Sequence, residues 1–139
     1  MCCLLMASFC PKSNGQLIFH RFNALTSRLS KSKTRFSLVF QVEGAVAAFT
    51  AIRQYLEGFK VGPLIGMSPE IAHALLIELV KRFGAENVVL DVPEPNRPAK
   101  AQAEGFGLLL VFETARMFKG GRPDYWLDGL FGVTSFESG

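Results

Sequence analysis

The sequence predicts an α/β domain, and two observations carry this prediction. Residues 69–83 have apolar side chains at helical spacing between a Ser-Pro start and a Gly stop. Short runs rich in β-branched and aromatic residues, which are typical of strands, lie before and after this helix. The 139 residues suit one domain, and their 49% apolar content is enough for a sizeable core.

Three strands are predicted before the helix. Residues 36–40 form a short apolar run with strand composition. Residues 44–55 and 59–65 lie on either side of a Gly turn, which favours a β-hairpin, although the alanines of 44–55 also permit a helix. Pro63 has no N–H, so we expect it at a sheet edge, a bulge or a gap in pairing.

The helix over residues 69–83 has signals at both ends. Ser68 caps its start, and Gly84 ends it. Its apolar face is predicted to pack against the sheet. His73 falls on the polar face, where a solvated role is favoured over a catalytic one. Ile77 falls there too, either as a lone surface residue or as a contact for a partner.

The second half of the chain alternates strand and helix. Residues 86–92 form an apolar run typical of a buried strand, and Asn96 can cap a short helix over residues 97–104. Residues 108–119 are predicted as one long strand, and residues 130–136 as the last strand. The predicted order of elements is therefore β-β-β-α-β-α-β-β.

Charge is distributed unevenly along the chain. The net charge is +3, but all charges in residues 1–35 are positive, whereas the rest of the chain has more acidic than basic residues. We therefore expect no nucleic-acid-binding patch on the domain. The predicted division is a basic, disordered N-terminal segment over residues 1–37 and a domain over residues 38–139.

The N-terminal segment has several interpretations. It is rich in Arg, Lys and Ser and has no acidic residue, as in mitochondrial presequences. The favoured interpretation is instead a segment that results from truncation or from an error in gene prediction. Cys2 and Cys3 beside a basic stretch also permit palmitoylation. All three cysteines lie in the first ten residues, so we expect no disulfide framework and no metal site in an intracellular, cytoplasmic domain. No apolar run reaches the roughly 18 residues that a transmembrane helix needs.

Four blocks of sequence resemble a known family. They are VGPL at 61–64, LDVPEPN at 90–96, VFETARMF at 111–118 and FGVTSF at 131–136. In this order they resemble the C-terminal acetyltransferase-like domain of tandem-domain GNAT N-acetyltransferases of the YitH type. The resemblance implies a mixed sheet flanked by helices, incomplete because it corresponds to the C-terminal half of a GNAT fold. It also implies acetyl-CoA as cofactor, a small amine as acceptor and a first GNAT domain before this one.

The resemblance assigns cofactor binding to Gly66, Met67 and Ser68. In this family, backbone N–H groups and the start of the following helix hold the diphosphate of acetyl-CoA. Residues 62–70 have no Arg or Gln at the loop start and no second Gly after Gly66. Glu70 is also unfavourable beside a diphosphate, because it brings a second negative charge to the helix start.

The tyrosine general acid of the family has no counterpart in this sequence. Many GNAT enzymes place this Tyr four residues before a Gly-Phe pair, and here Ala101 precedes Gly105 and Phe106. The chain is therefore predicted not to be a self-sufficient transferase. A non-catalytic interaction or regulatory module, derived from a tandem acetyltransferase, is the alternative.

Several side chains are candidates for an acceptor site. Glu113 could be a general base and Arg116, on the opposite face of the same predicted strand, could hold a carboxylate or phosphate. Ion pairs or solvent-facing positions are the simpler interpretations of both. Asp91 could bind a substrate cation or cap a turn. Tyr125 and Trp126 could form a lid over a substrate amine or cover the edge of the core.

The predicted hairpin supplies two further candidates and a docking surface. Arg53 and Tyr55 are assigned to substrate contact, because a GNAT substrate lies near the splayed central strands. Half of a GNAT sheet has an open edge where the other half would pair. We therefore expect homodimerisation, or docking to another acetyltransferase domain, through residues 36–55.

Overall fold

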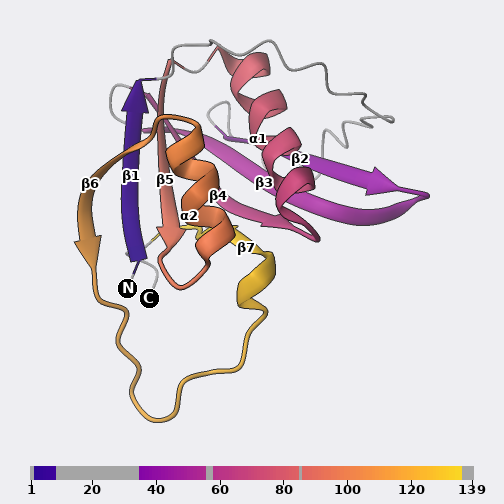
Figure 1. The fold of residues 1–139 in the computed structure, drawn as a ribbon. Helices are drawn as coiled ribbons and strands as arrows, with labels where there is room; N and C mark the ends of the chain where they lie inside the picture. Colours follow the sequence, from indigo (N-terminus) through magenta and orange to yellow (C-terminus); the bar gives the residue numbers. More distant parts are fainter. Residues whose placement is uncertain (1, 9–34, 56–57, 85, 136–139) are drawn as a thin grey trace.

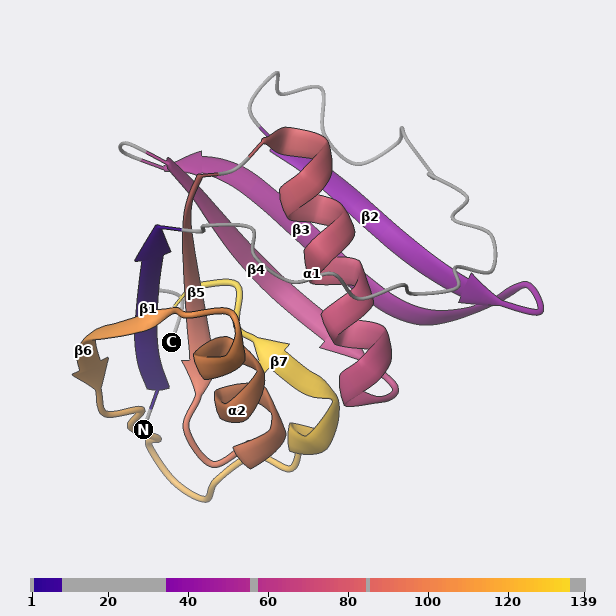
Figure 2. The same cartoon turned by 45° about the horizontal axis from the view of Figure 1, so that its top comes forward.

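The computed structural model describes residues 2–8, 35–55, 58–84 and 86–135. They form a seven-stranded sheet with two helices packed on the same face (Figures 1 and 2). The strands are β1 Cys2–Ser8, β2 Arg35–Val42, β3 Ala45–Tyr55, β4 Gly58–Gly66, β5 Asn87–Pro93, β6 Leu109–Thr114 and β7 Leu130–Gly132. The helices are α1 Pro69–Phe83 and α2 Arg97–Gly105, and a short 3-10 helix, η1, covers Leu127–Gly129. Among the described residues no helix has the length and apolar character needed to cross a membrane.

The sheet has the strand order β2-β3-β4-β5-β1-β6, and β7 pairs with the end of β4. β2, β3 and β4 are consecutive antiparallel strands, whereas β4 and β5 are parallel because α1 connects them. The predicted hairpin is therefore confirmed, and its first arm is a strand rather than a helix. Glu43 and Gly44 turn the chain between β2 and β3 with positive φ angles of 51° and 84°.

The irregular pairing expected at Pro63 is present. The pairing of β3 with β4 shifts between Thr50 and Ile52, opposite residues 61–64. A proline cannot donate a hydrogen bond to a neighbouring strand, and an irregular segment removes the need for that donor.

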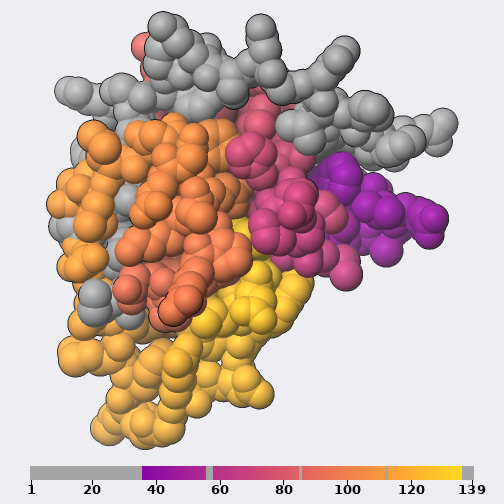
Figure 3. Space-filling model, viewed as in Figure 1, coloured from indigo at the N-terminus to yellow at the C-terminus, as the bar shows by residue number. Residues whose placement is uncertain are grey.

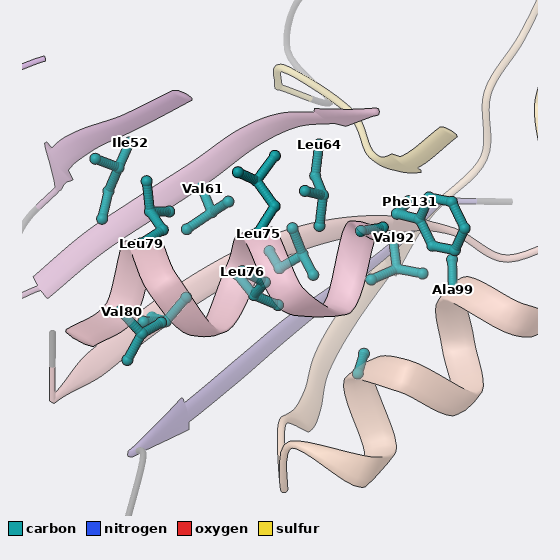
Figure 4. Close-up of a cluster of buried hydrophobic side chains, with 14 of the residues drawn as sticks. Ile52, Val61, Leu64, Leu75, Leu76, Leu79, Val80, Val92, Ala99 and Phe131 are labelled. Carbon is teal, nitrogen blue, oxygen red and sulfur yellow. The ribbon is translucent and has the colours of Figure 1, made fainter. Parts of the chain in front are cut away.

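Helix α1 has the bounds and the end signals that the sequence predicts. Ser68 Oγ accepts a hydrogen bond from the Ile71 N–H (3.4 Å), and Gly84 ends the helix in a left-handed conformation (φ 55°). The inner face of α1 packs on β2, β3 and β4 (Figure 4). Its buried residues are Ala72, Ala74, Leu75, Leu76, Leu79 and Val80. Burial of each large aliphatic side chain contributes about 1.5–3 kcal/mol, so this face holds the helix on the sheet.

Helix α2 begins at its predicted cap, where Asn96 Oδ1 accepts a hydrogen bond from the Ala99 N–H (3.1 Å). After α2, Phe106 stacks on the His73 ring of α1 with 4.6 Å between ring centroids. The solvated position predicted for His73 is therefore wrong, because its ring is half-buried at the contact between the helices. This burial lowers the pKa of His73, since it disfavours the charged imidazolium.

Two strands are shorter than the sequence predicts. Thr114 pairs with Cys2, the first residue of β1, so the residues that follow Thr114 have no partner in that strand. Residues 115–126 form a loop instead, and the strand predicted over residues 108–119 is wrong in its second half. β7 likewise covers only the beginning of the predicted strand over residues 130–136.

Strand β1 lies in the segment that the sequence predicts as disordered. It pairs antiparallel with β5 on one side and with β6 on the other, and so joins these two strands (Figure 1). The short apolar run at the N-terminus therefore supplies a strand that its periodicity did not indicate. Residues 9–34, on which most of the presequence interpretation depends, lie outside the described residues.

Candidate functional site

The central strands β4 and β5 separate part-way along the sheet. They pair in parallel only between residues 59–61 and residues 88–90. Beyond this point β7 pairs with β4, and the Val133 N–H donates a hydrogen bond to the Asp91 carbonyl oxygen of β5 (2.8 Å). The opening between the two strands, near which the substrates of the resembled family are expected, is thus occupied by the chain itself (Figure 2).

Close packing fills this opening. A Cβ atom on Gly62 would collide with the Val133 carbonyl oxygen, and one on Gly132 would lie 2.6 Å from Leu90 Cδ1. Phe131, between these two segments, is 1% exposed and belongs to the core. Glycine is required at both positions because neighbouring atoms already occupy the space of a side chain.

The three residues predicted to bind the cofactor lie together at the start of α1, but their surroundings are already filled. A Cβ atom on Gly66 would lie 3.0 Å from a side-chain carbon of α1. The Met67 N–H donates a hydrogen bond to the Ala47 carbonyl oxygen (2.9 Å). The Ile71 N–H, the donor that a helix start offers to an anion, is bound to Ser68 Oγ.

The rest of this first turn is equally unsuited to a diphosphate. Pro69 has no N–H to donate. The Glu70 carboxylate accepts hydrogen bonds from the Ser68 hydroxyl and from its own backbone N–H, and these bonds lower the pKa of Glu70. An ionised carboxylate repels a phosphate. The start of α1 therefore does not fit the diphosphate of acetyl-CoA, because its donors are used and an acid holds the position of the anion.

A buried ion pair lies on the face of the sheet that points away from the helices. Lys60 Nζ is 2.9 Å from Asp91 Oδ2, and both side chains are 1% exposed. Lys60 points to this face because its neighbours Phe59 and Val61 pack with the core under α1. The Asp91 carboxylate thus binds this lysine, and a substrate cation site or a turn cap at Asp91 stays a prediction. The only signal in the sequence is a lysine inside an apolar run.

Arg53 and Tyr55, which the resemblance assigns to substrate contact, lie beside this ion pair. Arg53 is the partner of Lys60 in the antiparallel pairing of β3 with β4. Lys60 Nζ is also 5.5 Å from the centroid of the Tyr55 ring. Because Tyr55 lies against the buried Lys60, it has a structural role as the cation–π partner of this lysine. Substrate contact by these two residues stays a prediction.

Glu113 and Arg116 do not share a strand. Glu113 is exposed on β6, an outer strand of the sheet, and Arg116 follows the end of that strand. The predicted arrangement of the two side chains on opposite faces of one strand is therefore wrong. A general-base role for Glu113 stays a prediction.

The loop over residues 115–126 brings together two of the predicted substrate residues. The guanidinium carbon of Arg116 is 5.4 Å from the centroid of the Tyr125 ring, and that of Arg122 is 5.5 Å from the same centroid. Arg122 Nη2 also donates a hydrogen bond to the Tyr125 hydroxyl (3.3 Å). Two cations thus hold the ring of Tyr125. In Figure 3 this part of the chain forms the lower end of the molecule, away from the helices.

Trp126 lies at the end of this loop and packs on η1. A Cβ atom on Gly129 would collide with the Trp126 ring, so the indole lies directly on the backbone of that turn. The Trp126 side chain is nevertheless 56% exposed. It therefore covers η1 and leaves one side of its ring available to solvent.

Asn96 fixes the position of both the loop end and β7. Its Nδ2 donates hydrogen bonds to the carbonyl oxygens of Leu127 (3.0 Å) and Leu130 (2.8 Å), and the residue is 2% exposed. The capping role of Asn96 in α2 is confirmed. Its second role was not visible in the sequence, because the two acceptors lie 31 and 34 residues further along the chain.

Comparisons with known proteins agree with this fold. A family model described as an acetyltransferase (GNAT) domain matches residues 17–131. The crystal structure of a "putative acetyltransferase" from Pyrococcus horikoshii is similar to this structure, with a TM-score of 0.55 and 26% sequence identity. The similarity covers 64% of this chain and 29% of that chain, so this chain spans less than a third of the relative. A search of curated proteins found no match.

Proposed function

This chain belongs to the GNAT acetyltransferase family, and we propose that it is the C-terminal portion of a YitH-type N-acetyltransferase that transfers acetyl from acetyl-CoA to a small amine. Membership of the family supports the reaction, and the short overlap with the Pyrococcus horikoshii chain supports the participation of a further domain. The proposal that a second domain takes part rests on the start of α1, where groups of the chain already bind the donors. Because this chain's own groups use the donors there, another acetyltransferase domain must supply the diphosphate site.

On this chain we propose that Arg116, Tyr125 and Trp126, in the loop over residues 115–126, contact the acceptor amine. The proximity of Arg116 and Tyr125 supports this assignment, and Trp126 adds an exposed aromatic face beside them. Glu113 lies just before the loop on an exposed outer strand, where solvent and a substrate can reach it. It is the proposed base that removes a proton from the amine.

Calorimetry tests the cofactor part of the proposal. Acetyl-CoA is titrated into the chain alone, and into a mixture with the part of the Pyrococcus horikoshii protein that this chain does not match. We expect no saturable binding to the chain alone below about 1 mM, which corresponds to a binding free energy of about −4 kcal/mol. Micromolar binding to the chain alone, together with turnover of an amine, would contradict the proposal.

A non-catalytic interaction or regulatory module is the second candidate function. The opening between β4 and β5, which β7 fills, favours it. Release of CoA from the mixture, measured with a thiol reagent over a panel of small amines, separates the two candidates. If this chain takes part in the transfer, Glu113→Gln lowers the rate by about 10²–10⁴-fold, and Lys119→Gln in the adjacent loop leaves it unchanged. If the chain is a regulatory module, neither variant changes the rate, but omission of the chain does.

We propose that the hairpin of β2 and β3 docks the partner domain or a second copy of this chain. β2 is an outer strand of the sheet, and an outer strand can pair with another chain. Val42 and Val46, near the hairpin turn, are 47% and 58% exposed. Val46→Lys is expected to abolish association in sedimentation velocity. A wild-type chain that stays monomeric alone and in the mixture would argue against this surface.

We also propose that the protein acts inside the cell, in the cytoplasm. The support is the distribution of cysteine, which is absent from residues 11–139, as expected for a domain that has no disulfide framework. Cell fractionation tests the location. N-terminal sequencing of the protein from cells tests whether a presequence is removed, and loss of residues 2–8 in that way would also remove β1.

A further inference from the structure

The loop after β6 forms a small open hollow on the surface, and residues of both charge signs line it. The hollow has a volume of about 230 Å³ and is lined by Arg122, Pro123, Asp124 and Tyr125. This volume lies below the roughly 300–1,000 Å³ of sites for drug-sized molecules, so it suits a ligand of few heavy atoms. An arginine, an aspartate and a tyrosine therefore line a space of the size of a small metabolite.

The ring at this hollow is held in place before any ligand arrives. Tyr125 is half-buried, and Arg116 and Arg122 lie over its ring at 5.4 and 5.5 Å. The hydrogen bond from Arg122 Nη2 to the Tyr125 hydroxyl also orients the guanidinium. A side chain that is already oriented loses less conformational entropy when it binds a ligand.

The two charged groups at the hollow keep their binding capacity. Within the described residues, neither Arg122 nor Asp124 has an ion-pair partner, and both are exposed. Arg122 donates a hydrogen bond to Tyr125, and a guanidinium has five N–H donors. It can therefore still bind a carboxylate through two parallel hydrogen bonds.

We propose that this hollow binds an α-amino acid, with its carboxylate on Arg122 and its ammonium group on Asp124. The ring of Tyr125 adds an apolar surface for the side chain of the amino acid. A simple anion would be repelled by Asp124, and a simple amine would be repelled by Arg122. Only a ligand that carries both charges satisfies both side chains.

This inference deepens the proposed function, because an amino acid bound in the loop over residues 115–126 would be the small amine that accepts the acetyl group. Its identity as the acceptor rests on the proposed function, but its binding does not. A ligand at this position would present its amine next to the carboxylate of Asp124. It follows that acceptors with a carboxylate near the amine are favoured over plain alkylamines.

Binding is measured with the full chain and without acetyl-CoA. Saturation-transfer NMR over the common amino acids, each at 10 mM, identifies those that bind, and the fluorescence of Trp126, the one tryptophan of the chain, gives their dissociation constants. Each binder is then compared with its carboxamide and with its N-acetyl derivative. We expect both derivatives to bind about fivefold more weakly or worse, the effect of losing one exposed charge contact of about 1 kcal/mol.

Three variants identify the side chains. Arg122→Gln should remove the preference over the carboxamide, and Asp124→Asn the preference over the N-acetyl derivative. Lys119→Gln, an exposed cation of the same loop that does not line the hollow, should leave both preferences unchanged. Thermal unfolding shows whether each variant is folded, and exposed positions such as these are expected to tolerate the change.

Three results would overturn the inference. The first is that no amino acid gives saturation transfer at 10 mM. The second is that amino acids and their derivatives bind equally, and the third is that Lys119→Gln acts like Arg122→Gln. The outcome is separable from that of the proposed function. Amino-acid binding without acetyl transfer in the mixture would reject only the transfer, and transfer to plain amines with no effect of Arg122→Gln would reject only the amino-acid site.

Discussion

The start of α1 and the loop over residues 115–126 differ in whether their polar groups are bound within the chain or exposed to solvent. At the start of α1, the Met67 and Ile71 N–H groups and the Glu70 carboxylate all bind groups of the chain itself. In the loop, by contrast, charged side chains lie exposed around a hollow. A well-formed helix start is therefore not by itself a diphosphate site, because the N–H groups at the start of α1 already bind groups of this chain. What decides ligand capacity is whether the donors there are already used.

The largest effect is expected where charge is buried rather than exposed. Lys60→Met removes one partner of the ion pair with Asp91 and leaves a buried carboxylate. We expect the free energy of unfolding to fall by about 3–5 kcal/mol, measured by urea denaturation. Lys119→Gln in the exposed loop is the matched comparison, and it should change this free energy by no more than about 0.5 kcal/mol.

A double variant separates the pair itself from its environment. Lys60→Met combined with Asp91→Leu removes both charges, so no unpaired carboxylate remains. It should recover most of the stability lost in the single variant. If the single and double variants are equally unstable, the loss comes from packing around Lys60, and the contrast between buried and exposed charge would not hold.

Asn96 joins the start of α2 to the residues that follow the loop, and its substitution gives the next largest effect. Asn96→Asp keeps the acceptor that caps α2 but loses the Nδ2 donor to Leu127 and Leu130. We expect a loss of about 2–4 kcal/mol, because two carbonyl oxygens lose their donor and face a carboxylate. Asn96→Ser is the control, since it keeps a capping oxygen without the added charge, and it should cost less. If both variants lose the same free energy of unfolding, the added charge has no effect, and the loss comes only from the missing Nδ2 donor.

The sequence predicted well those features that depend on neighbouring residues. The bounds of α1 follow from Ser68, Gly84 and the apolar spacing between them, and the irregular pairing at Pro63 follows from its missing N–H. These signals act within a few residues, so tertiary structure has little room to override them.

Features that depend on distant partners were missed. The end of β6 is set by Cys2, which lies more than a hundred residues earlier in the chain. The pairing of Lys60 with Asp91 likewise requires the parallel register of β4 and β5. Within the candidate site, Arg116 lies near Tyr125 because residues 115–119, which the sequence predicts as strand, are part of a loop. Neither propensity nor periodicity carries information about such register and loop geometry.

Ser68→Ala tests whether the Ser68 side chain occupies the free N–H donor at the start of α1. This variant frees the Ile71 N–H and removes the hydroxyl that binds Glu70. We expect the free energy of unfolding to fall by about 1 kcal/mol, the usual cost of losing a helix cap. Ser68→Thr keeps the hydroxyl and should cost less. If Ser68→Ala is as stable as the wild type, the cap is not what closes this position.

The smallest effect is a pH dependence from His73 on α1, whose ring stacks on Phe106. Burial lowers the pKa of His73 below 6.5, so the unfolded chain takes up a proton first as the pH falls. The stabilising contribution of the neutral ring is therefore complete well above pH 6.5 and is lost as the pH falls through 6.5 towards the lower folded-state pKa. Because the ring is only half-buried, we expect a loss of about one to two degrees in Tm between pH 8 and pH 5.5 beyond that of His73→Gln. The difference between the two proteins isolates His73 from the carboxylates, since Glu70, whose pKa is lowered from 4.5, stays ionised over this range. A loss of Tm that is equal in both proteins would place the His73 ring in solvent and undo its assignment to the contact with Phe106.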